Sequence, residues 1–267
     1  MDDRPVGIFD TGYGGLTALS AFRKCMPDEN IIFFGDNSRA PYGPRPVSQI
    51  KQFTSEIIGY LESRGVKAML AACGTISLNA PDILKSASVP VLNVVKPSVE
   101  YLASLKGSSP LGIIATEASI KSGGYVESLR RAGVKREIIT SPCYEYAAFV
   151  EQGLAWSDER VRKATEQYLE PLKKAGVKTV LLGCTHYGAL SRAISAYLGA
   201  DTELVSASCC GAGALAEFLN ENNLSGGNGN IEYCTSGDAE SFKVTGSAVL
   251  GEEILNVTHV GLNRLTI

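Results

Sequence analysis

Short apolar segments alternate with segments of helical periodicity along the whole chain. We expect strands at the apolar segments, which are residues 5–9, 30–35, 66–72, 90–95, 111–115, 138–141, 177–182, 203–206 and 231–235. We expect helices at residues 15–24, 47–64, 97–105, 124–132, 158–174, 188–198, 211–219 and 239–250. Continuously apolar strands separated by helices are typical of parallel sheets covered on both faces. The sequence therefore predicts a doubly wound α/β fold.

One segment of the chain is repeated after 111 residues. Residues 65–73 (GVKAMLAAC) and 176–184 (GVKTVLLGC) share Gly, Val, Lys, Leu and Cys in register. A chain of 267 residues is also long enough for two domains of about 150 residues or fewer. In each copy a cysteine, Cys73 or Cys184, follows the carboxyl end of a strand, where open α/β sheets bind their ligands. If the two copies face each other, the two thiols meet across one cleft.

The charge pattern and the cysteine count exclude several classes of function. The net charge is −3, from 25 basic and 28 acidic residues without a block of like charge, so we expect no nucleic-acid partner. The N-terminal residues lack the pattern of a signal peptide, and no apolar run approaches the roughly 18 residues of a membrane span. We therefore expect a cytoplasmic protein that does not bind membranes. Seven scattered cysteines make a disulfide framework unexpected in such a chain.

Two opposed thiols suit the inversion of a carbon next to a carboxylate. Such an inversion needs a base on one face of the carbon and an acid on the other. A cysteine has an ordinary pKa near 8.5, so thiol and thiolate are both accessible and can exchange roles in each turnover. The alternative is that Cys73 and Cys184 are small buried residues, which is how we interpret the remaining five cysteines, at positions 25, 143, 209, 210 and 234.

Four motifs follow one another in the order found in a known family. They are residues 9–17 (FDTGYGGLT), 34–43 (FGDNSRAPYG), 72–75 (ACGT) and 182–186 (LGCTH). With them the chain resembles the glutamate racemases of the aspartate/glutamate racemase superfamily, over essentially its whole length. The resemblance implies two doubly wound domains related by a pseudo-twofold axis, with the active site in the cleft between them. It divides the chain into residues 1–97 plus 209–267, which carry Cys73, and residues 98–208, which carry Cys184.

The resemblance also implies a function and a site. The activity would be cofactor-independent interconversion of L- and D-glutamate, supplying D-glutamate for peptidoglycan, by a homodimer with no metal. Cys73 and Cys184 would transfer the protons, assisted by Asp10 and His186. The residues implied in binding the amino acid are Asp10, Thr11, Tyr42, Gly43, Gly74, Thr75, Thr116, Ser119, Thr185 and His186.

Each of these assignments has a plainer alternative. Asp10 could be only a helix N-cap, His186 only a structural imidazole, and Thr75 and Thr185 only caps. Residues 42–43 could form only a turn. Glu151 also matches a carboxylate of the family, but a solvated surface residue is an equal alternative.

Two departures from the family pattern affect the expected substrate. The usual Cys-Asn-Thr is Cys73-Gly74-Thr75 here, and the usual Glu-Pro is Lys96-Pro97. Loss of one hydrogen bond to a charged group costs about 1.5–3 kcal/mol, which weakens activity but need not end it. The alternatives left open are a racemase for another acidic amino acid such as aspartate, and a non-catalytic amino-acid-binding or regulatory paralogue.

Three other site types fit the sequence less well. Residues 9–12 (FDTG) match an aspartic protease signature, but only one copy is present, in a strand-turn-helix context. The glycines at 12–15 lack the lysine of a phosphate-binding loop. Two histidines without paired C-x-x-C motifs do not make a zinc site.

Overall fold

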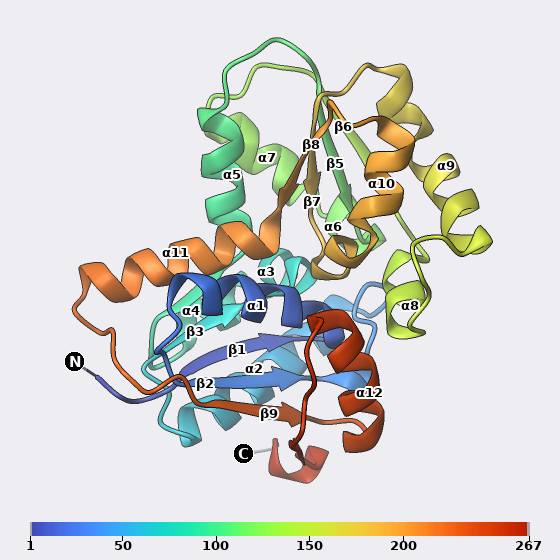
Figure 1. Cartoon of the computed structure of the whole chain (residues 1–267). Coiled ribbons are helices and arrows are strands. Elements are labelled where there is room, and N and C mark those ends of the chain that lie inside the picture. Colours follow the sequence, from blue (N-terminus) through green and yellow to red (C-terminus); the bar gives the residue numbers. More distant parts are fainter. Residues whose placement is uncertain (1, 266–267) are drawn as a thin grey trace.

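The computed structural model, in which residues 2–265 are described, contains two parallel sheets (Figure 1). The six-stranded sheet consists of β1 (Val6–Asp10), β2 (Ile31–Gly35), β3 (Ala68–Ala71), β4 (Val91–Asn93), β9 (Ile231–Thr235) and β10 (Val257–His259). The four-stranded sheet consists of β5 (Leu111–Ala115), β6 (Ile138–Pro142), β7 (Thr179–Leu182) and β8 (Glu203–Ser206). We call residues 6–93 with 231–259 the first lobe and residues 111–206 the second lobe.

The two sheets have the same strand order. The first runs β10-β9-β2-β1-β3-β4 and the second β6-β5-β7-β8, so β2-β1-β3-β4 corresponds to β6-β5-β7-β8. The registers also correspond, because Val6 pairs with Ala68 in one sheet and Leu111 with Thr179 in the other. The sequence repeat is therefore a repeat of topology, and the α/β fold class is confirmed.

Helices cover both faces of the sheets (Figure 1). Those of the first lobe are α1 (Leu16–Cys25), α2 (Val47–Ser63), α3 (Gly74–Asn79), α4 (Pro81–Ser86) and α12 (Ala239–Leu250). Those of the second lobe are α6 (Glu117–Lys121), α7 (Gly124–Arg131), α8 (Tyr146–Glu151), α9 (Glu159–Lys174) and α10 (Ser191–Leu198). Short 3-10 helices lie at η1 (Tyr13–Gly15), η2 (Asn37–Arg39), η3 (Thr185–Leu190) and η4 (Leu262–Arg264).

Alternate residues of each central strand belong to different hydrophobic clusters. Ile8 of β1 packs under α1, whereas Phe9 packs on the α2 side. Because the strands have apolar residues on both faces, they are buried throughout, as a parallel sheet requires. The candidate active site lies at the carboxyl ends of the central strands.

The chain crosses between the lobes twice. The first crossing follows β4 through α5 (Val95–Ser104), and the second follows β8 through α11 (Ala207–Glu221). These two helices pack against each other, and α11 runs along α1 (Figure 1). The domain boundaries at residues 97 and 209 stay a prediction.

Several predicted boundaries are wrong. The strand predicted at 90–95 ends at Asn93, because the Asn93 side chain accepts the amide hydrogens of Val95 and Lys96 and starts α5 two residues before the predicted position. Ser206 caps α11 by accepting the amide hydrogen of Cys209, so this helix begins at residue 207 instead of 211. The helix predicted at 188–198 is divided into η3 and α10.

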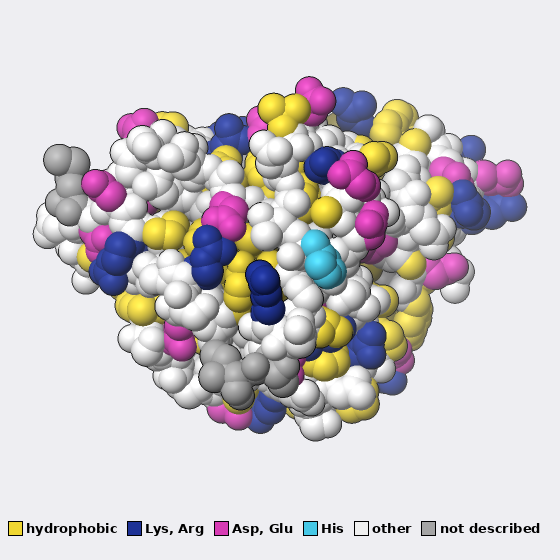
Figure 2. All heavy atoms as spheres, turned by 90° about the horizontal axis from the view of Figure 1, so that it is seen from below, with side chains coloured by type: hydrophobic (Ala, Val, Ile, Leu, Met, Phe, Trp, Pro, Cys, Tyr) yellow, Lys and Arg dark blue, Asp and Glu magenta, His cyan; other side chains and the backbone are white. Residues whose placement is uncertain are grey.

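The surface agrees with the mixed charge pattern of the sequence. The face seen from below in Figure 1 has basic and acidic side chains interspersed, without a patch of one sign (Figure 2). Within residues 2–265, none of the helices combines the length and the apolar character that crossing a membrane requires.

Candidate active site

Cys73 and Cys184 occupy equivalent positions in the two lobes. Each lies two residues beyond a central strand, Cys73 after β3 and Cys184 after β7, and each begins a helical turn with its backbone. Only 7% of Cys73 and 9% of Cys184 is exposed. The repeated strand end therefore brings a nearly buried thiol to the same edge of each sheet.

The loops that carry the two cysteines lie against each other. A Cβ atom added at Gly74 would collide with the backbone carbonyl oxygen of Gly183, so the residues next to the two cysteines are in contact. Burial raises the pKa of the Cys73 thiol well above its ordinary value, and the charges of Asp10 and Cys184 raise it further. Cys73 is therefore protonated at neutral pH in the unliganded protein.

Asp10 joins the two lobes. It is the last residue of β1, and its carboxylate accepts hydrogen bonds from the Thr11 amide (2.6 Å) and from the Thr185 hydroxyl (2.6 Å) of the second lobe. Burial raises the pKa of Asp10, against the opposing effects of His186 and these hydrogen bonds. Asp10 caps no helix here: the residue before α1 is Gly15, and no side chain caps that helix.

A second contact between the lobes consists of hydroxyl groups. Thr75 Oγ1 lies 3.0 Å from Thr116 Oγ1, which donates to Ser119 Oγ at 3.0 Å. Thr116 also caps α6, whereas Thr75 and Thr185 cap no helix with their side chains. A Cβ atom at Gly43 would lie 3.4 Å from the Thr116 Cβ atom. These predicted binding residues therefore lie together, and their contacts with a substrate stay a prediction.

His186 is held between Cys184 and Glu151. Its Nδ1 atom lies 3.6 Å from Cys184 Sγ, and its Nε2 atom lies 2.6 Å from Glu151 Oε1. Burial alone would lower the pKa of His186, but the hydrogen bonds and charges of Cys184 and Glu151 outweigh it and raise the pKa well above 6.5. An imidazole in this position can receive the Cys184 proton or return it.

Glu151 is also bound by the first lobe. The Tyr13 amide donates to Glu151 Oε1 at 3.2 Å. Gly12 and Gly14 permit this approach, because a Cβ atom at Gly12 would collide with Glu151 and one at Gly14 would lie 2.5 Å from His186 Nδ1. The sequence left Glu151 undecided between the site and the surface, and the structure places it at the site.

Glu151→Gln should lower the pKa of His186. The variant removes one of the two groups that raise it, so the imidazole titration observed by NMR should move to lower pH. The raised pKa stabilises the fold fully below about pH 6.5, and this stabilisation is lost as pH rises through the native pKa. The stability deficit of the variant should therefore be larger at acidic than at alkaline pH. The chain has two histidines, so His259→Gln assigns the signals, and an unmoved midpoint would contradict the prediction.

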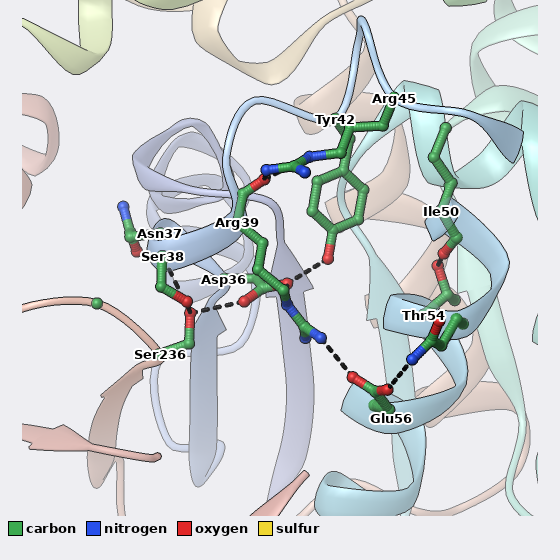
Figure 3. A network of polar contacts seen from close by, with 12 residues as sticks. Asp36, Asn37, Ser38, Arg39, Tyr42, Arg45, Ile50, Thr54, Glu56 and Ser236 are labelled. Carbon is green, nitrogen blue, oxygen red and sulfur yellow. Dashed lines mark hydrogen bonds and ion pairs between the residues drawn. The ribbon is translucent and has the colours of Figure 1, made fainter. Parts of the chain in front are cut away.

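Tyr42 is directed toward a buried charged cluster (Figure 3). Its hydroxyl donates to the Asp36 carboxylate, which also accepts from Arg39 Nε (2.7 Å) and from the Ser236 hydroxyl (2.6 Å). Arg39 additionally pairs with Glu56 of α2. Only 1% of Tyr42 is exposed, and its hydrogen bond to Asp36 holds the loop before Gly43 in place. A direct contact of Tyr42 with the substrate stays a prediction.

Tyr42→Phe should destabilise the protein. It removes a buried hydrogen bond to a carboxylate, which is worth about 1.5–3 kcal/mol of unfolding free energy. Urea unfolding measures the change. Tyr101→Phe is the control, because its hydroxyl bonds to Glu203 on the surface and its loss should have no measurable effect. Equal midpoints for the two variants would show that the Tyr42 hydroxyl contributes nothing.

Lys96 and the other five cysteines are not among the residues described above for the candidate site. The Lys96 side chain is 79% exposed and pairs with Glu100 at 3.8 Å. Cys143 and Cys234 are buried as expected, but the expectation of burial is wrong for Cys25 and Cys209, which are exposed, and Cys210 is only partly buried. All the cysteines are free thiols. The effect of Lys96 on substrate choice stays a prediction.

The fold and the site together define a class of protein: two repeated α/β lobes that bring a cysteine from each strand end to one polar interface. Residues 17–208 match the Asp/Glu/hydantoin racemase family. The chain belongs to this family, and racemases are isomerases. This confirms the resemblance that the four motifs predict.

Named relatives extend over the whole chain. The glutamate racemase of Geobacter metallireducens is 34% identical over 267 residues, covering 98% of each chain. A glutamate racemase isoform from Bacillus anthracis superposes with a TM-score of 0.91 at 30% identity, covering 98% of this chain and 99% of the other. The glutamate racemase of Francisella tularensis, solved in complex with D-glutamate, gives 0.90 at 30% identity with the same coverage.

Proposed function

We propose that this protein interconverts L- and D-glutamate without a cofactor, using Cys73 and Cys184 as the two bases. The observation that carries the proposal is the contact between the two cysteine loops, in which Gly74 of one lobe packs on Gly183 of the other. In the proposed reaction, the substrate binds at this contact with one thiol on each side of its α-carbon. The equivalent placement of the thiols fits a reaction that runs equally well in both directions.

The proton balance of the reaction is simple. In one direction, the Cys184 thiolate takes the proton from the α-carbon while the Cys73 thiol gives its proton to the opposite face. The products are the inverted amino acid, a Cys184 thiol and a Cys73 thiolate. In the reverse direction the two cysteines exchange these roles.

The neighbouring groups restore the thiols between turnovers. His186 lies 3.6 Å from Cys184 Sγ and can carry its proton, with Glu151 holding the imidazole. On the other side, burial raises the pKa of Asp10, so that its carboxyl group can return a proton to Cys73. Asp10 and His186 thus have matching roles at the two thiols.

The substrate would be held by the polar groups at the interface between the lobes. We assign this role to the backbone at Gly43 and Gly74 and to the hydroxyls of Thr11, Thr75, Thr116, Ser119 and Thr185, with Tyr42 positioning its loop. Hydroxyls and backbone amides can bind two carboxylates and an ammonium group without a basic side chain.

The names of the relatives support glutamate as the substrate. The curated relatives that span the chain are glutamate racemases, and the structure from Francisella tularensis contains D-glutamate. Aspartate remains the alternative, because Gly74 removes the side chain next to Cys73. The other alternative is a paralogue that binds an amino acid without turnover.

One experiment separates these possibilities. The protein is incubated in deuterated water with L-glutamate, D-glutamate or either aspartate, and inversion is followed by circular dichroism and α-deuterium by mass spectrometry. The proposal requires inversion of both glutamate enantiomers with deuterium in the product. Inversion of aspartate alone would reassign the substrate, and absence of exchange with all four would falsify the enzymatic assignment.

The cellular role follows from the proposed product. D-glutamate is a component of peptidoglycan, so the protein would supply cell-wall synthesis from the cytoplasm, acting as a homodimer. Depletion should then create a requirement for external D-glutamate, and light scattering should give twice the chain mass of 28.3 kDa. Growth without D-glutamate, or a single-chain mass, would contradict these two parts of the proposal.

A further inference from the structure

Tyr125 lies beside the contact between the two cysteine loops. It is the second residue of α7, and only 2% of it is exposed. Its hydroxyl donates a 3.2 Å hydrogen bond to the carbonyl oxygen of Gly183, the residue before Cys184. A Cβ atom at Gly183 would lie 3.0 Å from the Tyr125 ring, so the glycine lets the ring pack on the backbone of this loop.

The same hydroxyl limits the residue after Cys73. A Cβ atom at Gly74 would lie 3.2 Å from the Tyr125 oxygen, in addition to its collision with the Gly183 carbonyl. Neither glycine has a left-handed backbone conformation, so the requirement at both positions is steric. In this chain, where glycine replaces the Asn usual in the family, Tyr125, Gly74 and Gly183 form one close contact, which we call the loop junction.

The phenol is also close enough to both sulfur atoms to interact with their charges. Burial raises the pKa of Tyr125, and the charges of Cys184 and Cys73 raise it further. The hydroxyl therefore stays neutral and keeps its proton for the bond to Gly183, whichever thiol is ionised. No step of the proposed reaction uses Tyr125, and the sequence analysis assigned no role to it.

We propose that Tyr125, together with Gly74, is a positioning residue that fixes the spacing of the Cys73 and Cys184 thiols. This inference rests on the proposed function. Inversion requires both sulfur atoms to reach one carbon at the same time, and a misplacement of about 1 Å can cost about 10²-fold in rate. The loop junction supplies a fixed stop, because Gly74 cannot approach the Gly183 carbonyl more closely and the Tyr125 bond holds that carbonyl in place.

A change in spacing has a specific chemical signature. If the thiols move apart, one thiol can still remove the α-proton, but the opposite thiol no longer delivers its own. The carbanion is then reprotonated from the side that it came from, after exchange of that proton with solvent. Substrate would gain deuterium without inverting, whereas general damage to the fold would lower exchange and inversion together.

The test measures the ratio of α-deuterium in unreacted substrate to that in inverted product, early in the reaction in deuterated water. Tyr125→Phe keeps the ring and removes the hydroxyl, whereas Gly74→Ala inserts a methyl group into the junction. We expect inversion to fall about tenfold for Tyr125→Phe and about a hundredfold for Gly74→Ala, with a higher ratio in both. The matched controls are Tyr101→Phe on the surface and Gly213→Ala, where an added Cβ meets no atom within 4 Å; both should keep the wild-type ratio.

The outcomes distinguish this inference from the proposed function. If wild-type protein inverts glutamate and both junction variants keep its ratio, the positioning role is overturned and the proposed function stands. If wild-type protein neither exchanges nor inverts glutamate or aspartate, the proposed function fails and this inference fails with it. Tyr125→Phe preserves packing, so a folded variant is available for the comparison, and circular dichroism verifies this.

Discussion

Replacing either Cys73 or Cys184 by Ser should lower racemisation about 10²–10⁴-fold, the usual contribution of a general acid or base. A serine hydroxyl ionises far less readily than a thiol, so the substituted side can neither remove nor deliver the proton. Each single variant should lose inversion in both directions, because each direction uses both sulfur atoms. Inversion is followed by circular dichroism with each enantiomer as the starting material.

Exchange with solvent deuterium gives a sharper result than the loss of inversion. Each variant retains one thiol, so it should exchange the α-proton of at most one enantiomer, and the two variants should prefer opposite enantiomers. Cys209 is exposed and is not one of the two proposed bases, so Cys209→Ser should behave as wild type. A single variant with normal inversion would exclude the two-base reaction.

Lys67→Met should reduce the unfolding free energy by about 3–5 kcal/mol, because removing one partner of a buried ion pair leaves the other charge uncompensated. Lys67 Nζ lies 2.7 Å from Glu29 Oε2, and the two side chains are 0% and 2% exposed. The ammonium also donates to the backbone oxygens of Asp2 (2.6 Å) and Gly226 (3.2 Å). The pair therefore ties the start of the chain and the loop before β9 to the amino-terminal ends of β2 and β3.

Urea unfolding measures this loss of unfolding free energy, and a double variant tests whether the uncompensated charge of Glu29 causes it. Adding Glu29→Gln to Lys67→Met removes the buried charge, so part of the stability should return. Lys96→Met removes a similar cation from an exposed pair and should leave the midpoint unchanged. A loss for Lys67→Met no larger than that of Lys96→Met would mean that the buried pair does not stabilise the fold.

The sequence predicted the features that repeat or that follow from local pattern. The copies at residues 65–73 and 176–184 predicted two equivalent strand ends, and the strands β3 and β7 lie within them. Apolar runs located the strands well because a buried parallel strand needs nothing else. Short helices such as α3 and α8 were missed, since six residues give too little periodicity to detect.

Contacts between distant segments could not be predicted in the same way. Glu151 reaches the Tyr13 amide across 138 residues, and no local pattern at either position indicates the other. Asp10 has the sequence context of a helix cap, yet it binds Thr185, 175 residues away. Tyr125 gained its role only from packing on two glycines. The chemistry at each strand end is thus local, whereas the pairing of the two ends depends on the tertiary fold.

The two crossings of the chain through α5 and α11 also constrain how glutamate could enter. Asp10, Thr75, Thr185 and both cysteines are less than 10% exposed, so a ligand has little access to them while the lobes stay together. A single tether would leave the lobes free to swivel, but two adjacent tethers packed on each other leave one hinge axis. Opening about that axis breaks the bonds from Asp10 to Thr185 and from Thr75 to Thr116, and reclosing returns each hydroxyl to its former partner. In the proposed two-thiol reaction, the paired tether would return the two sulfur atoms to the same alignment after each opening.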